Sequence, residues 1–403
     1  MINFVKNGVC APKGFRAAGI HSGIRKSKSK KDLALIVSDV PANAAAVYTT
    51  NIVQAAPIFV TKKNLIDGKA QAIICNSGIA NAAVRDGVEK ATAMCTLTAD
   101  ALKINAQDVI VASTGVIGQS LNLNPIGEGL PKLVEQLSAD GSAEASEAIM
   151  TTDTFAKEVA VSFDIDGRTV IIGGIAKGSG MINPNMATML GFLTTDAEVS
   201  SKQLTKMLKV ASDISFNRVS VDGDTSTNDM LAIMANSQSG VKINTKATAK
   251  KFQEGLNAVC IHLAKLMAKD GEGATKLIEC TVSGAPNFKA GEKVADSIIN
   301  SSLVKTAMFG NDANWGRILC AVGYSGIRLD ISKIDISFFS VAGEIIVCKN
   351  GTGVDFSEEK ATEILKQNEI TIAVKLNQGK AVATAWGCDL SYDYVKINGD
   401  YRS

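Results

Sequence analysis

The chain has 403 residues, of which 46% are hydrophobic and 20% are charged, a composition typical of an ordered globular protein. Because a single hydrophobic core stops growing at roughly 250 to 300 residues, we expect two or three cooperating lobes. Lys and Arg number 42 against 40 Asp and Glu, so the net charge of +2 excludes a field that would collect nucleic acid or anionic lipid.

The first residues, 1–15, lack the apolar core that a signal peptide requires. No window reaches the ~18 to 20 uninterrupted apolar residues of a membrane span. The eight cysteines are scattered without a Cys-x-x-Cys pair, and most lie inside apolar runs, which favours buried reduced thiols over disulfides or zinc ligands. The sequence therefore predicts a cytoplasmic protein.

Short runs of β-branched and other apolar residues predict strands at 33–39, 71–75, 108–113 and 169–176. Several of these runs are apolar on both faces, which indicates sheets that are covered on both sides. Helical periodicity follows at 200–214, behind a serine N-cap.

A second helix is predicted at 247–269, which ends at an Asp-Gly pair. Further on, Asp355 and Glu358 have the spacing of a capping box, and residues 372–386 have the pattern of a hairpin around 377–379. The sequence therefore predicts a mixed α/β protein. It contains no linker or repeat that would locate lobe boundaries.

The glycine-rich run at 173–181 does not have the spacing of a phosphate-binding loop. Lys177 precedes Gly178, whereas a P-loop needs the order Gly-Lys-Ser/Thr at the start of a helix. A dinucleotide fingerprint fails as well, because Asn183 occupies the position of the third glycine.

Two other kinds of site are poorly supported. The oxygen-rich segment 222–229 has Thr227 at the sixth position, where a calcium loop of the EF-hand type needs glycine. Only His21 and His262 are available for a histidine-based triad or zinc site, and His262 lies within a predicted helix, where a packed or partly exposed imidazole is expected.

The segment "NMATML", residues 185–190, places the hydroxyl of Thr188 in an apolar stretch. A hydroxyl is a weak nucleophile at neutral pH unless a base lies beside it, and one solution is a threonine whose own α-amine is the base. That amine has a pKa of about 7.7 to 8.0 and becomes free only if the bond between Ala187 and Thr188 is cleaved. The alternative, a threonine that merely packs in a helix or strand, is common for such a short segment.

The wider context resembles one family. Residues 177–197, "KGSGMINPNMATMLGFLTTDA", are similar almost throughout to the signature of the ornithine acetyltransferase family, also called glutamate N-acetyltransferases. The similarity covers most of the chain, through the segments "VYTTNIVQAAPI", "NSGIANAA", "STGVIG", "MTTDT", "SFNRVSVDGDTSTNDM", "DGEGATKLIE", "FGNDANWGRI" and "VKINGDYRS". Two positions depart from the family pattern: Ile79, where asparagine is expected, and Asn311, where a smaller residue is usual.

The resemblance implies that the chain cleaves itself before Thr188. The products would be an α fragment, 1–187, and a β fragment, 188–403, which remain folded together and assemble as an α2β2 particle. The implied architecture is the layered α/β fold of DmpA and the ornithine acetyltransferases, with mixed sheets and helices. The α fragment would carry the oxyanion hole, and the β fragment the nucleophile and a C-terminus that closes the pocket.

The resemblance also implies a reaction in arginine biosynthesis. Thr188 would take the acetyl group from N-acetylornithine, release ornithine, and pass the acetyl group to glutamate in a ping-pong cycle through an acetyl ester. Thr114 and Gly115 match the oxyanion hole of the family, in which one donor contributes roughly 3 to 4 kcal/mol. A turn at the end of a strand is the alternative reading of these two residues, and it is compatible with that role.

Substrate contacts are implied for Thr151, Lys177 and Glu272, with Thr152 as a neighbouring candidate. Glu272 would meet an ammonium group. Two alternatives remain open: Glu272 as a solvated loop carboxylate, and Lys177 as the partner of an acid at the surface.

The resemblance further assigns Asn398 and Ser403 to closing of the substrate pocket. Residues 221–229 and 310–317 also match family segments, and we assign them to packing, backbone hydrogen bonds or subunit contacts. The resemblance implies neither a metal nor a cofactor, although some family members accept acetyl-CoA as a substrate. The alternatives are a self-processed aminopeptidase or amidase of related fold, and an uncleaved protein that only binds amino acids.

Overall fold

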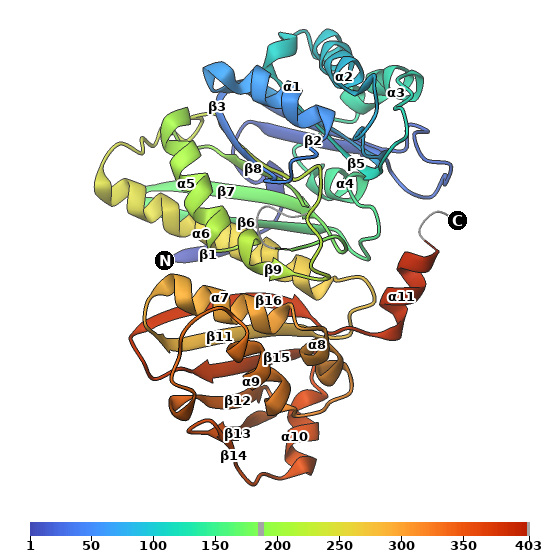
Figure 1. The fold of residues 1–403 in the computed structure, drawn as a ribbon. Coiled ribbons are helices and arrows are strands. Elements are labelled where there is room, and N and C mark those ends of the chain that lie inside the picture. Colours follow the sequence, from blue (N-terminus) through green and yellow to red (C-terminus); the bar gives the residue numbers. More distant parts are fainter. Residues whose placement is uncertain (184–188, 401–403) are drawn as a thin grey trace. The chain divides into compact units, whose positions relative to one another are not determined.

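The computed structural model describes residues 1–183 and 189–400. These residues form two compact units (Figure 1). The first unit comprises Met1–Gly178, Asn185–Asn217 and Asp224–Leu263, and the second comprises Ser179–Pro184, Arg218–Gly223 and Ala264–Ser403. The chain therefore passes between the units several times.

The first unit is built on a mixed sheet that contains nine strands within the described part of the chain. The strand order is β1-β6-β7-β8-β10-β3-β4-β5, with β2 paired to β3. The pairs β4–β5 and β8–β10 are parallel, and the other pairs are antiparallel. The strands are β1 (Ile2–Val5), β2 (Phe15–Ile20), β3 (Leu33–Tyr48), β4 (Lys69–Ile79), β5 (Val109–Val116), β6 (Lys157–Ile165), β7 (Arg168–Lys177), β8 (Leu190–Thr195) and β10 (Met230–Ala235).

Helices cover both faces of this sheet. The helices are α1 (Ala56–Asn64), α2 (Gly87–Leu102), α3 (Asn124–Glu135), α4 (Ser142–Ala148), α5 (Ser201–Asp213) and α6 (Lys246–Lys269). Along β4, Ala72 and Ile74 belong to one hydrophobic cluster, while Ile73 and Cys75 belong to another. Because alternate residues of a strand point to opposite faces, both faces of β4 are buried. This confirms the predicted covered sheet and explains why the strand is apolar without alternation.

The two helices predicted from periodicity are present. Helix α5 begins after Ser200, whose hydroxyl accepts a hydrogen bond from the backbone N–H of Gln203. Helix α6 buries one complete apolar face and continues from the first unit into the second, where it ends at Lys269. His262 lies on α6 and its ring packs against Phe4 at a centroid distance of 5.3 Å, which agrees with the packing role expected for it.

The second unit contains a sheet of seven strands among the residues described, in the order β14-β13-β12-β15-β11-β16-β9. The strands are β9 (Val219–Ser220), β11 (Leu277–Ala285), β12 (Asp335–Ser340), β13 (Gly343–Lys349), β14 (Thr352–Gly353), β15 (Glu369–Lys375) and β16 (Ala381–Cys388). Its helices are α7 (Phe288–Ile299), α8 (Ser302–Phe309), α9 (Trp315–Gly323), α10 (Glu358–Leu365) and α11 (Tyr392–Gly399). Short 3-10 turns occur in both units. They are η1 (Gly8–Cys10), η2 (Leu65–Asp67), η3 (Ala106–Asp108), η4 (Phe216–Arg218) and η5 (Ile331–Lys333).

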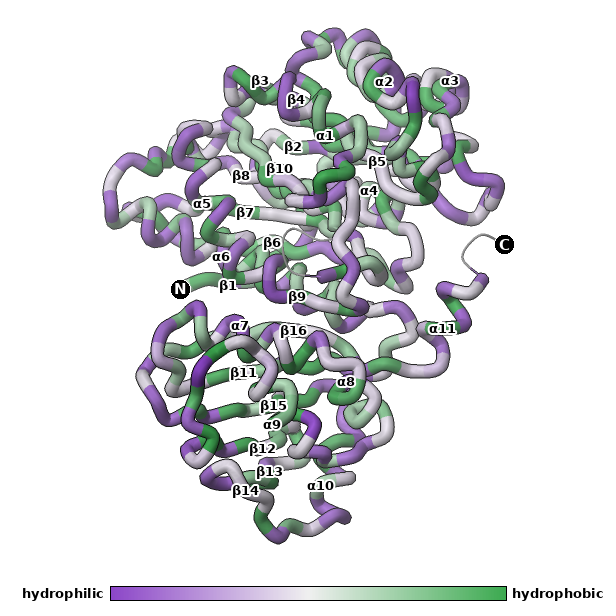
Figure 2. Tube along the Cα trace, in the orientation of Figure 1, coloured by the Kyte–Doolittle hydropathy of each residue, from purple (hydrophilic) through white to green (hydrophobic). Residues whose placement is uncertain are grey.

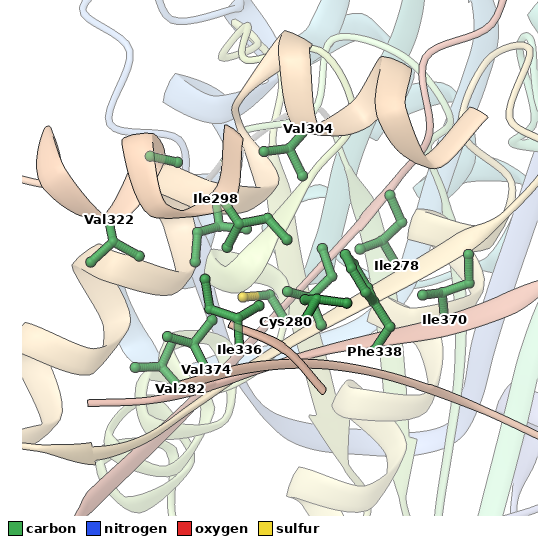
Figure 3. Packing of buried hydrophobic residues seen from close by; sticks show 14 of the residues in the cluster. Ile278, Cys280, Val282, Ile298, Val304, Val322, Ile336, Phe338, Ile370 and Val374 are labelled. Carbon is green, nitrogen blue, oxygen red and sulfur yellow. The ribbon is translucent and has the colours of Figure 1, made fainter. Parts of the chain in front are cut away.

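The core of the second unit lies between one face of its sheet and the helices that cover it. Cys280 of β11 and Ile336 of β12 belong to this buried cluster together with Ile298 of α7 and Val322 of α9, as Figure 3 shows. Hydrophobic residues are concentrated along β11, β12 and β15 in Figure 2, in agreement with their burial. The predicted mixed α/β class with layered sheets and helices is thus confirmed.

Two local predictions in this unit are wrong. Helix α10 begins after Ser357, whose hydroxyl accepts from the N–H of Lys360, so Asp355 is not the cap. Residues 372–386 do not form a hairpin, because β11 lies between β15 and β16 and pairs with both. The connection instead bonds to the end of β11, where the N–H of Gln378 donates to the carbonyl of Gly284 at 2.8 Å.

All eight cysteines are free thiols, and seven of them are buried, as predicted; Cys320 is exposed. None of the helices within the described ranges is long and apolar enough to cross a membrane.

The first sheet includes β1–β7 from before position 188 and β8 and β10 from after it. The predicted α and β fragments would therefore share one sheet.

We expect Asp296→Asn to stabilise the protein at alkaline pH. Burial, and then the charge of Glu292, raise the pKa of Asp296 to about 7 against a smaller opposing effect of Arg218. A raised carboxyl pKa means that the unfolded chain releases this proton at a lower pH than the folded protein does. Stability is therefore unaffected below about pH 4, is lost as pH rises from about 4 to about 7, and stays reduced above that. Urea unfolding should show the variant more stable by about 1 to 3 kcal/mol at pH 8.5 and equal near pH 4.

The exposed Glu363 of α10 offers a control in the same unit. Glu363→Gln should follow the pH dependence of the parent protein. The free energies of unfolding of the parent protein and Asp296→Asn could instead change in the same way from pH 4 to 8.5. That result would show that the surroundings do not raise the pKa of Asp296.

Candidate functional site

The proposed nucleophile Thr188, the preceding Ala187 and the C-terminal Ser403 lie outside the described residues. The chain is described again from Met189, which leads directly into β8. The N–H of Met189 donates to Oδ1 of Asp229 at 2.7 Å. The second residue after the predicted scissile bond is thus fixed to a buried carboxyl group.

Thr114 and Gly115 lie near the end of β5, and both pair with residues of β4. Thr114 is paired with Ser77 and Gly115 with Gly78 in the parallel register. Gly115 has a φ of +132°, and a Cβ there would lie 2.2 Å from the carbonyl carbon of Gly78. Only glycine fits this position, because any side chain would collide with the neighbouring strand.

Asn228 and Asp229 connect these two parts of the first unit. The side-chain amide of Asn228 donates to the carbonyl oxygens of Ala80 at 2.7 Å and Ser113 at 2.8 Å, and Ser113 directly precedes Thr114. The adjacent Asp229 holds the N–H of Met189. The sequence assigns segment 221–229 to packing, backbone hydrogen bonds or subunit contacts, and it does not predict that Asn228 and Asp229 lie beside Ser113 and Met189.

The carboxyl group of Asp229 is fully buried. Burial raises its pKa well above the ordinary value, while the bonds from Met189 and Thr49 and the charge of Lys177 act in the opposite direction. Asp229 therefore retains its proton to a higher pH than an exposed aspartate does. The signal in the sequence was an Asn-Asp pair immediately before a fully apolar strand.

The structure brings Thr151 and Lys177 together in the first unit. Lys177 ends β7 and is 3% exposed, and its Nζ donates to Oγ1 of Thr151 at 2.7 Å. Nζ also lies 3.9 Å from Oδ2 of Asp153. The surface pairing that we considered for Lys177 is therefore wrong, since both the ammonium group and its acid are buried. Thr152, the neighbouring candidate, is the next residue along the chain.

Asp153 organises this region and was not predicted. Its carboxylate accepts hydrogen bonds from the N–H of Thr151 at 2.9 Å, the N–H of Gly178 at 2.7 Å and Nζ of Lys157 at 2.7 Å. The side chains of Asp153 and Lys157 are both completely buried. One carboxylate thus holds the backbone of Thr151 and of Gly178, the residue after Lys177.

The charges of this cluster do not cancel. Burial alone would raise the pKa of Asp153, but Lys177 and Lys157 outweigh it and hold the pKa well below its usual range. Burial lowers the pKa of Lys177, Lys157 adds to that effect, and Asp153 opposes it. Two ammonium groups share one carboxylate, so the cluster carries a surplus positive charge when both are protonated. A substrate carboxylate beside Lys177 would neutralise this surplus.

Glu272 and Asn398 meet within the second unit. Glu272 follows α6, is 8% exposed, and accepts at Oε2 a hydrogen bond from Nδ2 of Asn398 on α11 at 2.8 Å. The alternative of a solvated loop carboxylate is therefore wrong. The N–H of Glu272 donates to the carbonyl of Ser179 at 2.8 Å, which ties this loop to the segment after Lys177.

Two glycines of the run at 173–181 are required by close contacts, Gly178 in the first unit and Gly180 in the second. Gly178 has a φ of +149° and donates its N–H to Asp153. Gly180 lies against Glu272, and a Cβ at this position would be 2.3 Å from the carboxyl carbon. The glycines thus allow close approach of two acidic side chains to the backbone rather than binding of a phosphate.

The two departures from the family pattern have ordinary structural roles. Ile79 lies at the end of β4, and its carbonyl accepts from Nδ2 of Asn76 at 2.9 Å. Asn311 has a φ of +54°, and its side-chain oxygen accepts from Nζ of the buried Lys276. In the parts of the chain that are described, no group of three or more His, Cys, Asp and Glu side chains is placed to hold a metal ion.

The two mixed sheets with their covering helices define the class of protein: an α/β protein whose first unit contains a buried charged cluster of Lys177, Asp153 and Lys157. The ArgJ family matches residues 16–403. The arginine biosynthesis bifunctional protein ArgJ of Caldanaerobacter subterraneus subsp. tengcongensis is 50% identical over 395 residues, which cover 97% of this chain and 98% of that protein. The protein of the same name from Symbiobacterium thermophilum is 48% identical over 406 residues and covers both chains completely.

A crystal structure of the arginine biosynthesis bifunctional protein ArgJ from Bacillus halodurans is 44% identical, with a TM-score of 0.49, and covers 52% of this chain and 97% of that chain. The family match and the identities over nearly the whole length establish that this chain belongs to the ArgJ family. The resemblance drawn from the sequence motifs is thereby confirmed.

We expect Asp153→Asn to destabilise the protein by about 3 to 5 kcal/mol at pH 7, because Lys157 would keep a buried charge without its anion. The depressed pKa of Asp153 means that its stabilising effect is present at neutral pH and is lost as pH falls below about 4. Denaturant unfolding at pH 7 and pH 3.5 measures both effects, and the difference from the parent protein should shrink at the lower pH.

The double variant Asp153→Asn/Lys157→Met is the matched control. Removal of both members of a buried ion pair costs much less than removal of one, so the double variant should regain part of the lost stability. A double variant that is less stable than Asp153→Asn would contradict this description of the cluster.

Proposed function

We propose that this chain transfers an acetyl group from N-acetylornithine to glutamate and also acetylates glutamate from acetyl-CoA. The observation that carries the proposal is the surplus positive charge at Lys177, Asp153 and Lys157, which suits a substrate carboxylate. Both amino-acid substrates contain one. The relatives that are 48% and 50% identical are named bifunctional proteins of arginine biosynthesis, and two acetyl donors account for two activities.

In the proposed mechanism the precursor cleaves itself before Thr188, and the new α-amine becomes the base for the threonine hydroxyl. Oγ of Thr188 attacks the acetyl carbonyl, its proton passes to the amine, and ornithine leaves with that proton. The α-amine of glutamate then attacks the acetyl ester, and Thr188 regains its proton. This cycle conserves the acetyl group and needs no cofactor.

Each half-reaction passes through a tetrahedral oxyanion. We assign its stabilisation to the hydroxyl of Thr114 and the N–H of Gly115. The close pairing of Gly115 with Gly78 supports this role, because a donor on a rigid strand needs no reorganisation when charge develops.

Lys177 and Thr151 would bind the substrate carboxylate, since their side chains are already bonded to each other and Asp153 holds the backbone of Thr151. Glu272 would receive the substrate ammonium, and Asn398 would hold the Glu272 carboxylate. We further propose that Ser403 helps to close the pocket, that the fragments assemble as α2β2, and that the enzyme is cytoplasmic.

We expect Thr188→Ala to abolish both self-cleavage and acetyl transfer, because the variant has no hydroxyl nucleophile. A denaturing gel of the parent protein should show two bands, and the variant should show one. Mass spectrometry of the parent protein after brief exposure to N-acetylornithine should find an added acetyl group on Thr188. Full turnover by an uncleaved chain would overturn the mechanism.

The same preparation separates the transferase from a hydrolase of related fold. Release of ornithine should match formation of N-acetylglutamate one for one. Release of free acetate without glutamate would instead identify water as the acceptor.

We expect Gly180→Ala to raise KM for N-acetylornithine about tenfold, the effect of losing one charge-assisted hydrogen bond. The added Cβ would displace the carboxylate of Glu272. The flexible end of that side chain can move, so the protein should still fold. Gly323→Ala is the control, because its Cβ would meet no atom within 4 Å. An unchanged KM in Gly180→Ala would argue against a substrate role for Glu272.

A further inference from the structure

The connection between β2 and β3 carries a concentration of positive charge that the proposed amino-acid chemistry does not use. Residues 25–31 have the sequence "RKSKSKK", with five cationic side chains in seven residues of a chain whose net charge is only +2. Lys26, Lys28 and Lys30 are exposed. Lys31 is paired with Glu147 at 2.7 Å. We call residues 25–31 the basic loop.

The base of the basic loop is anchored rather than loose. Asp32 is completely buried and accepts hydrogen bonds from the N–H groups of Ser22 at 2.6 Å, Gly23 at 3.2 Å and Arg25 at 3.0 Å. Nδ1 of His21 lies 3.2 Å from the same carboxylate. Since the carboxylate of Asp32 is already bonded to these groups at the base of the loop, it does not pair with the exposed lysines.

The anchored end of the loop lies beside the candidate site. The guanidinium of Arg25 donates to the carbonyl of Met150, which directly precedes Thr151. The stem of the same side chain covers Gly78, where a Cβ would lie 2.8 Å from Cγ of Arg25. Gly78 is the β4 partner of Gly115. Neighbouring strands are about 4.8 Å apart, so the loop starts roughly one strand spacing from the candidate oxyanion hole.

We propose that the basic loop binds the phosphate groups of acetyl-CoA while the acetyl thioester lies at Thr114 and Gly115. This inference rests on the acetyl-CoA activity in the proposed function. Acetyl-CoA carries its charges on a pyrophosphate and a 3′-phosphate, which an uncharged arm with two amides separates from the thioester. That arm is about as long as four or five residues of extended chain, or roughly 15 Å at 3.3 Å per residue.

The loop can reach the phosphates of acetyl-CoA while the thioester lies at Thr114 and Gly115. The loop starts near Gly78 and returns to its base at Asp32, so Lys28 near its tip is three residues, or at most roughly 10 Å of extended backbone, from Arg25. The long lysine side chain extends that reach toward the length of the uncharged arm. Ammonium groups bind phosphate as mobile point charges, which suits a flexible polyanion. N-acetylornithine and glutamate have no phosphate, so the loop distinguishes one acetyl donor from the other.

The acetyl-transfer step balances without a further reactant. Oγ of Thr188 attacks the thioester carbonyl and the C–S bond breaks. The threonine proton passes through the α-amine to the departing sulfur, and CoA leaves as a thiol. The acetyl ester that remains is the same one that N-acetylornithine forms, so glutamate completes either reaction in the same way.

The test is the variant Lys26→Gln/Lys28→Gln/Lys30→Gln of the full chain. KM for acetyl-CoA should rise about tenfold, since each exposed lysine-phosphate contact contributes modestly and three are removed. KM for S-acetylpantetheine, which has the arm but no phosphate, and KM for N-acetylornithine should not change. Added salt should weaken acetyl-CoA binding in the parent protein and have less effect on the variant.

The control Lys202→Gln/Lys206→Gln/Lys209→Gln makes the same change of net charge at exposed positions on α5. It should leave KM for acetyl-CoA unchanged. The inference is overturned if the loop variant retains the parental KM for acetyl-CoA, or if the α5 variant shows the same loss.

Failure of the acetyl-CoA activity itself is distinguishable from failure of the inference. If the parent protein exchanges acetyl groups between ornithine and glutamate but does not use acetyl-CoA, calorimetry with CoA decides. Binding of CoA that is lost in the loop variant supports the site and rejects only the activity. No binding of CoA by the parent protein refutes the site and leaves the transfer between amino acids standing.

Discussion

The buried carboxylate of Asp153 is the constraint on which the first unit's candidate site depends. A carboxylate without water costs several kcal/mol unless donors surround it, and here two backbone N–H groups and the ammonium of Lys157 do so. These donors belong to the segment before β6, the start of β6 and the residue after β7. Satisfying one charge therefore fixes the ends of two strands and, with them, the position of Lys177.

The same interaction links stability to ligand binding. The short contact to Asp153 is made by Lys157 at 2.7 Å, whereas Lys177 stands 3.9 Å away and bonds to a neutral hydroxyl. Lys157 thus meets the structural need for a counter-charge and leaves Lys177 only partly neutralised. A folded protein that keeps an incompletely paired ammonium group in its interior loses stability unless an anion binds there. This is a reason for such a cluster to occur at a binding site rather than in an ordinary core.

The sequence predicted what depends on local pattern and missed what depends on distant pairing. Covered strands followed from continuous apolar runs and helix α5 from apolar periodicity. The hairpin at 372–386 failed because β11, about 90 residues earlier, inserts between its two strands. Motif resemblance supplied Lys177 and Glu272, but Asp153 and Asp229 read as ordinary polar residues. Their role arises only when folding buries them, and burial of a charged residue is decided by segments remote in the sequence.

Strand β8 explains how a chain can be cut beside this site without losing its architecture. All six residues of β8 are buried, and the strand is paired with β7 from before the predicted cleavage point and with β10 from after it. The break would therefore fall in the connection between β7 and β8 and would remove no sheet hydrogen bond. A new terminus at 188 would begin two residues before β8, next to Met189, whose N–H is already held by Asp229. The hydrogen bond to Asp229 and the pairing of β8 thus fix the backbone directly after the proposed terminus, and they do not depend on the bond that would be cut.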